Sequence, residues 1–183
     1  MKYLLDGQET ERLIFRKIQR SDFDQWLEFF KDPRTSEHWI EEKESPEKEC
    51  TKWYEKQFSR YKNDKGGMNA LIEKKGGKLI GHCGLLVQTI DNTFELEIGY
   101  SLLSEFWNRG FATEAANYCK DFAFQNELTE SLISIISLTN IQSGKVAIKN
   151  GMTAEKTTTY NGNLVNIFRI KKVDWEKLTV HKE

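Results

Sequence analysis

Residues 97–115, EIGYSLLSEFWNRGFATEA, form the stretch that decides the fold. The pattern predicts a strand, a short loop and a helix that begins near Gly110. The first backbone N–H groups of a helix have no partner inside it, and its dipole favours negative charge there. Gly110 and Ala112 have little bulk, so a diphosphate can approach this backbone closely, with added contacts from Arg109 and the Thr113 hydroxyl. The stretch therefore predicts a phosphate-binding loop; a plain strand-to-helix turn capped by glycine is the alternative.

The rest of the chain predicts an α/β (α+β) fold with a mixed central sheet and helices packed on its faces. Strands are expected at 12–18, 69–73, 79–87, 94–102, 131–138, 153–160 and 165–173, and helices at 23–31, 47–61, 111–124 and 141–149. No internal repeat or linker divides the sequence, so a single domain over residues 1–183 is expected.

The composition argues against several classes of protein. The 27 Lys and Arg nearly balance 28 Asp and Glu, and a net charge of -1 argues against nucleic-acid or membrane binding. No stretch approaches the roughly 18 apolar residues of a membrane span, and the start does not form a secretory signal, so a cytoplasmic protein is expected. The three cysteines show no Cys-x-x-Cys spacing and the three histidines do not cluster, so no disulfide framework and no metal site is predicted.

Four segments of the chain resemble the GCN5-related N-acetyltransferase (GNAT) family, and within it the ribosomal-protein N-terminal acetyltransferase (RimJ/RimL-like) branch. They are TERLIFR at 10–16, EIGYSL at 97–102, WNRGFATEA at 107–115 and NIQSGKVAIKNGM at 140–152. The resemblance covers nearly the whole chain. It implies the acyl-CoA N-acyltransferase (GNAT) fold, in which two parallel central strands splay apart around the pantetheine arm of acetyl-CoA. Here these strands are 94–102 and 131–138.

The resemblance also implies which residues bind acetyl-CoA, the expected cosubstrate. Backbone groups from Tyr100 to Leu102 pair with the pantetheine arm, and Asn140 bonds it as well. The amides that hold the diphosphate belong to Asn108, Arg109, Gly110, Phe111, Ala112 and Thr113. The loop departs from the usual family pattern at its first position, where Trp107 stands in place of Gln or Arg.

A second departure concerns the acid that protonates the leaving thiolate. Many family members carry a tyrosine for this task where the chain has Ala147. Ser143 is the candidate in its place, with helix capping as its alternative role. For the base, period-two alternation puts Glu95 and Glu97 on one face of the central strand. Like charge and partial burial are both expected to raise a carboxyl pKa toward neutrality, as suits a general base. A solvated strand face is the alternative, more so for Glu95.

The expected reaction is direct attack of a neutral amine on the thioester, with the oxyanion held by a strand N–H near Leu102. Cys83 and Cys119 are interpreted as core thiols and not as acyl carriers. His82 is interpreted as a hydrogen-bonded structural residue, with proton relay as the alternative.

The acceptor cleft is expected between two walls. The first two helices with the loop at 31–44 form one, and the hairpin at 160–163 forms the other. By resemblance, the acceptor is a protein N-terminal α-amine or a small amine such as an amino acid, polyamine or aminoglycoside. A non-catalytic module that binds acetyl-CoA is the rival hypothesis, supported by Ala147. A homodimer is compatible with the sequence, although no feature establishes one.

Overall fold

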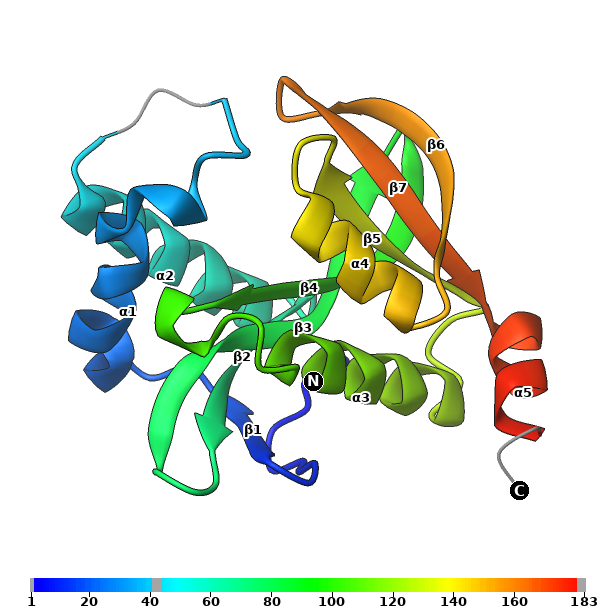
Figure 1. Cartoon of the computed structure of the whole chain (residues 1–183), viewed down its shortest axis with the longest axis horizontal. Helices are drawn as coiled ribbons and strands as arrows, with labels where there is room; N and C mark the ends of the chain where they lie inside the picture. Colours follow the sequence, from blue (N-terminus) through cyan, green and yellow to red (C-terminus); the bar gives the residue numbers. More distant parts are fainter. Residues whose placement is uncertain (1, 41–43, 181–183) are drawn as a thin grey trace.

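The computed structural model describes residues 2–40 and 44–180, and its strands form one sheet in the order β1-β2-β3-β4-β5-β7-β6 (Figure 1). The strands are β1 (Leu13–Lys17), β2 (Gly66–Glu73), β3 (Lys78–Ile90), β4 (Thr93–Leu102), β5 (Ser131–Ser137), β6 (Thr153–Tyr160) and β7 (Asn163–Lys171). The helices are α1 (Phe23–Lys31), α2 (Pro46–Lys62), α3 (Phe111–Gln125), α4 (Ile141–Lys149) and α5 (Lys172–Val180), with 3-10 turns η1 (Arg20–Asp22), η2 (Pro33–Thr35) and η3 (Ser104–Phe106). Within the described ranges, none of these helices has the length and apolar character to span a bilayer.

The sheet consists of two antiparallel halves that meet only at the parallel pair β4 and β5. The parallel ladder between these two strands contains a single pair of partner residues, Glu97 and Ile133. A side chain adds a further link, because the Ser134 hydroxyl donates to the Ile98 carbonyl at 2.9 Å. Beyond this point the strands separate, which confirms the predicted splay.

Helices cover both faces of the sheet, as predicted. Residues directly opposite each other in an antiparallel pair project to the same face, and Cys83 lies opposite Tyr100 while His82 lies opposite Ser101. Cys83 contacts Cys119 of α3, so Tyr100 also projects to the α3 face. α4 contacts α3 and lies on this face too. His82 packs under α1 and α2, so the alternation along β4 directs Glu97 to the α1 and α2 face.

One helix was not predicted from the sequence. The strand expected to continue to residue 173 ends at Lys171, and α5 begins at Lys172. The helix is attached to α3 by Trp175, whose indole Nε1 donates to Asp121 Oδ1 at 2.8 Å and whose ring lies 5.4 Å from that of Phe124. This anchor comes from an element about 50 residues earlier in the chain, so local periodicity does not reveal it.

Candidate active site

The loop before α3 has the geometry of an anion-binding site. Gly110 is the N-cap of α3 with φ +81°, and Asn108 also has positive φ, at +58°. Among the described residues, no side chain caps this helix end. The first bond inside the helix runs from the Glu114 N–H to the Gly110 carbonyl at 3.0 Å. The N–H groups of residues 111–113 therefore lack acceptors in the helix, and they suit an anion as the sequence predicts.

Two motifs about 100 residues apart hold this loop in place. The Glu114 carboxylate accepts from the Thr10 hydroxyl at 2.6 Å, and from the backbone N–H and Nε of Arg12 at 2.9 and 2.6 Å. The Arg12 Nη1 then donates to the Arg109 carbonyl at 2.9 Å. Burial raises the pKa of Glu114, but these hydrogen bonds outweigh burial and leave the pKa lowered. Sequence reasoning missed both roles, although Arg12 and Glu114 belong to the motifs that carry the family resemblance.

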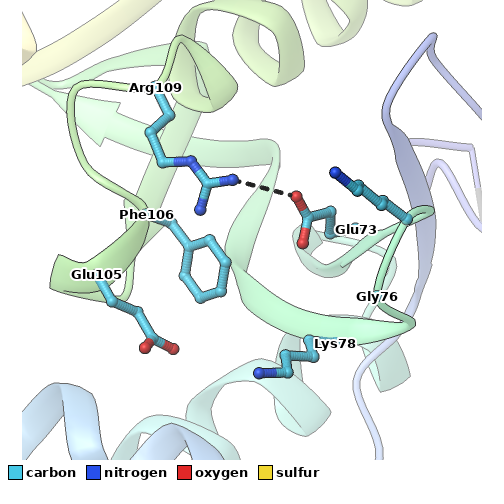
Figure 2. A pocket seen from close by; sticks show the side chains of 7 residues that line it. Glu73, Gly76, Lys78, Glu105, Phe106 and Arg109 are labelled. Carbon is cyan, nitrogen blue, oxygen red and sulfur yellow. Dashed lines mark hydrogen bonds and ion pairs between the residues drawn. The ribbon is translucent and has the colours of Figure 1, made fainter.

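The side chain of Arg109 points to β2. Its guanidinium lies 3.4 Å from the Glu73 carboxylate, and both side chains line a cavity of about 450 Å³ (Figure 2). The guanidinium also lies over the rings of Phe106 and Phe111. The cavity is also lined by Lys75, Gly76, Lys78 and Glu105. The predicted contact of this side chain with a diphosphate stays a prediction.

The end of β4 presents a free edge to the splay. The Leu103 N–H donates to the Ile80 carbonyl of β3 at 3.0 Å. Because alternate residues of a strand direct their N–H groups to opposite edges, those of Leu102 and Tyr100 point away from β3 and toward the gap. The Trp107 indole donates to the Leu102 carbonyl at 2.8 Å and ties the loop to the strand end. Trp107, which stands where the family pattern has Gln or Arg, therefore stabilises the turn. The sequence alone did not indicate this role.

Asn140 and Ser143 lie opposite this edge, at the start of α4. Asn140 is the N-cap, and its Oδ1 accepts from the Ser143 N–H at 3.0 Å. The Tyr100 hydroxyl donates to the Ser143 carbonyl at 2.8 Å and so bridges β4 and α4. The structure thus brings together three of the residues that the sequence assigned to the pantetheine arm and the leaving thiolate. The acid role of the Ser143 hydroxyl stays a prediction.

The Tyr100 bridge can be tested by removing one oxygen. Tyr100→Phe is expected to lower the free energy of unfolding by about 1 kcal/mol, the usual net value of one such hydrogen bond. Urea unfolding measures this difference. An unchanged unfolding midpoint would show that the bridge does not hold α4 against β4.

Glu97 lies on β4 on the face covered by α1 and α2, where its Oε2 accepts from the Gln88 Nε2 at 2.6 Å. Burial raises the pKa of Glu97, and the Gln88 amide and the Arg60 charge only partly offset this rise. The raised pKa agrees with the expectation for a general base.

The expected contribution of Glu95 to this pKa is wrong. Glu95 forms a two-pronged ion pair with Arg169 at 2.6 and 3.0 Å, and both side chains are largely buried. Its charge is neutralised by β7, an element that the strand pattern alone could not place beside it. Glu95 is therefore neither a solvated residue nor the neighbour that raises the pKa of Glu97, and burial is the main cause.

The comparisons with known proteins agree with this geometry. The acetyltransferase (GNAT) domain family matches residues 12–153 of the chain. This chain belongs to the GNAT family. The family resemblance and the GNAT fold predicted from the sequence are thereby confirmed.

Individual relatives of this GNAT chain differ in how much of it they match. The uncharacterized protein YkkB of Bacillus subtilis is 36% identical over 99 residues, which are 52% of this chain and 58% of that protein. An acetyltransferase from Agrobacterium tumefaciens has a similar solved structure, with TM-score 0.75, 23% identity and coverage of 89% of this chain and 92% of that one. RimL, a ribosomal-protein alpha-N acetyltransferase solved in complex with coenzyme A, has TM-score 0.71 and 15% identity, and the coverage is 90% and 97%.

Three further residues lie in the core of this GNAT domain. The interpretation of Cys83 and Cys119 as core thiols is confirmed: both are fully buried, with their sulfurs 3.5 Å apart, and burial raises the pKa of Cys119. His82 is structural as well, but the expected hydrogen bond is wrong. Neither ring nitrogen has a partner among the described residues, and burial lowers its pKa to about 3. The enclosure by α1 and α2 keeps its imidazole neutral.

The two walls predicted for an acceptor cleft contact each other in the structure, and the binding of an acceptor between them stays a prediction. The His38 Nδ1 lies 3.0 Å from the Thr139 hydroxyl, and the Ile40 N–H donates to the Asn163 Oδ1 at 2.6 Å. Trp39 and Tyr160 both pack on a cluster of aliphatic side chains that includes Ile133 and Ile135 of β5. Residues 41–43 of the predicted wall lie outside the described residues. The loop after α1 thus spans the splay and contacts the β6–β7 hairpin.

Proposed function

We propose that this GNAT acetyltransferase moves the acetyl group of acetyl-CoA to a primary amine by direct attack. The observation that carries the proposal is the uncapped start of α3 beside the free edge of β4. When the diphosphate of acetyl-CoA binds the N–H groups of residues 111–113, its pantetheine arm extends along this edge into the splay. The elements assigned to the cosubstrate lie on the α3 and α4 face of β4, and Glu97 lies on the other face. The two reactants therefore meet where the sheet is open.

The chemistry follows from these positions. Glu97 accepts a proton from the ammonium form of the substrate, directly or through water, and leaves a neutral amine. The amine nitrogen forms a bond to the thioester carbon while the Leu102 N–H donates to the developing oxyanion. The attacking nitrogen loses its extra proton to solvent, the C–S bond breaks, and the CoA thiolate takes a proton from the Ser143 hydroxyl, which solvent restores. The products are an N-acetyl amine and CoA.

The acceptor we propose is a protein N-terminal α-amine, as the ribosomal-protein branch of the family implies. RimL, an alpha-N-protein acetyltransferase, shares this fold, as does a spermidine N-acetyltransferase, so the fold by itself is compatible with either acceptor class. A small amine is the other acceptor class. A non-catalytic module that binds acetyl-CoA is the second candidate function, and Ala147 supports it because this buried position holds no hydroxyl.

Two measurements test the proposal. CoA at about 100 times its dissociation constant is expected to stabilise the protein by about 2.7 kcal/mol, which a shift in melting temperature reports. Release of free thiol from acetyl-CoA is then followed with peptide α-amines, polyamines, amino acids and aminoglycosides. Binding without thiol release from any acceptor supports the non-catalytic module. An unchanged melting temperature with saturating CoA contradicts both functions.

A further inference from the structure

A chain of hydrogen bonds from α2 through β3 reaches the carboxylate of Glu97. The Arg60 Nη2 donates to the Gln88 Oε1 at 2.9 Å, and the Gln88 Nε2 donates to the Glu97 Oε2 at 2.6 Å. An amide has one accepting and one donating end, whereas a guanidinium only donates. Because Arg60 must bind the oxygen, the NH2 end of Gln88 must face Glu97. The orientation of the amide is thus determined by chemistry.

Arg60 is itself held by two backbone groups. Its Nη1 donates to the carbonyls of Val87 and Lys65 at 3.1 and 3.2 Å. These contacts hold the guanidinium between the end of α2 and strand β3. Neither Arg60 nor Gln88 belongs to the loops that bind acetyl-CoA. Their hydrogen bonds are directed to the residue that takes the proton.

We infer that Arg60 and Gln88 are positioning residues for the base, which hold the Oε2 of Glu97 and so fix the orientation of the carboxylate that receives the proton of the amine. The inference rests on the proposed function of Glu97. It explains how a carboxylate on a strand can keep one orientation at the point where the neighbouring strand departs. It also gives the reaction a dependence on two residues that do not touch the substrate.

The groups that face Glu97 come from several elements. Arg60 and Lys56 of α2 and the Gln88 amide favour its ionised form, as does the backbone N–H of Ile135 on β5. Tyr160 of β6 is another neighbour of Glu97. Burial raises the pKa of the Tyr160 phenol and the charge of Glu97 raises it further, so the phenol remains neutral. Glu95 is paired with Arg169. Among these groups Gln88 donates the short side-chain hydrogen bond, so its loss should raise the pKa of Glu97.

The test combines a direct titration with a rate profile. In Gln88→Leu, the carboxyl ¹³C resonance of Glu97, identified by its absence in Glu97→Gln, is expected to titrate about one pH unit higher than in the parent. The acid limb of kcat/KM should move by the same amount. Gln88→Glu adds no bulk and should shift both upward through like charge, and it serves if the leucine variant does not fold. Arg60→Met should also raise the pH at which Glu97 titrates, and Arg60→Lys, which keeps a donor, should raise it by less.

Gln25→Leu is the matched control, because Gln25 also makes one side-chain hydrogen bond, to the Leu79 carbonyl at 2.8 Å, but on α1. Gln25→Leu should shift neither the Glu97 titration nor the acid limb of kcat/KM. The CoA-induced rise in melting temperature shows that each variant keeps its cosubstrate site. An unmoved Glu97 titration in both Gln88 variants overturns the inference. A moved titration with an unmoved rate profile supports the hydrogen-bond chain and instead refutes Glu97 as the base.

Discussion

Glu97→Gln is expected to lower kcat by about 10²–10⁴-fold, the range that a general base contributes, and to leave the affinity for CoA unchanged. The substitution keeps the size of the side chain and removes only its ability to accept a proton. Thiol release with a saturating amine measures the rate, and the CoA-dependent melting temperature measures binding. The matched control is Glu95→Gln. It removes, from the same face of β4, a carboxylate that is paired with Arg169. Equal kcat in Glu97→Gln and the parent would contradict the assignment.

The pH dependence of the same variant gives an independent check. Burial raises the pKa of Glu97, so the parent rate should fall as the pH drops through a value above the ordinary carboxyl range. This limb should be absent from the residual activity of the variant. The free energy of unfolding of the parent should show the opposite pH dependence and decrease as the pH rises. A raised folded-state pKa means that Glu97 favours folding below its unfolded pKa and that this contribution is lost as the pH rises through the folded value. The glutamine variant should therefore melt at a higher temperature than the parent at neutral pH.

Glu114→Ala is expected to lower the free energy of unfolding by about 2–3 kcal/mol, because it removes the acceptor of three hydrogen bonds from Thr10 and Arg12. It should also weaken CoA binding about 10-fold, or about 1.4 kcal/mol, since Arg12 then no longer holds the Arg109 carbonyl in place. Urea unfolding and calorimetric titration with CoA measure the two effects. Glu105→Ala is the control, since it removes the same charge from an exposed position in the preceding turn.

The difference between the parent and Glu114→Ala should depend on pH. The folded-state pKa of Glu114 is lowered, so its contribution is present above the unfolded pKa and is lost as the pH falls through the folded value. The two proteins should therefore approach equal stability in acid. If Glu114→Ala binds CoA as tightly as Glu105→Ala at neutral pH, the link between the two motifs is structural and does not serve the cosubstrate.

Much of the fold was predictable because its signals are local. Helices α1 and α4 have the predicted bounds, and α3 begins after Gly110 as expected. Hydrophobic periodicity, capping residues and a glycine with positive φ act within a few residues of each other, so they can be read along the chain. Strand ends were less well predicted: β2 begins three residues early, and β7 gives way to α5.

The local pattern of residues 97–115 was enough to place the anion-binding turn, the central strand and the candidate base in one unit. The environment of that base was not predictable in the same way. Arg169 neutralises Glu95 from a position 74 residues away, and Gln88 and Arg60 reach Glu97 from another strand and a helix. A pKa and a side-chain orientation depend on desolvation and on donors from every element that packs nearby. These are known only once the chain has folded, because folding brings distant charges into contact.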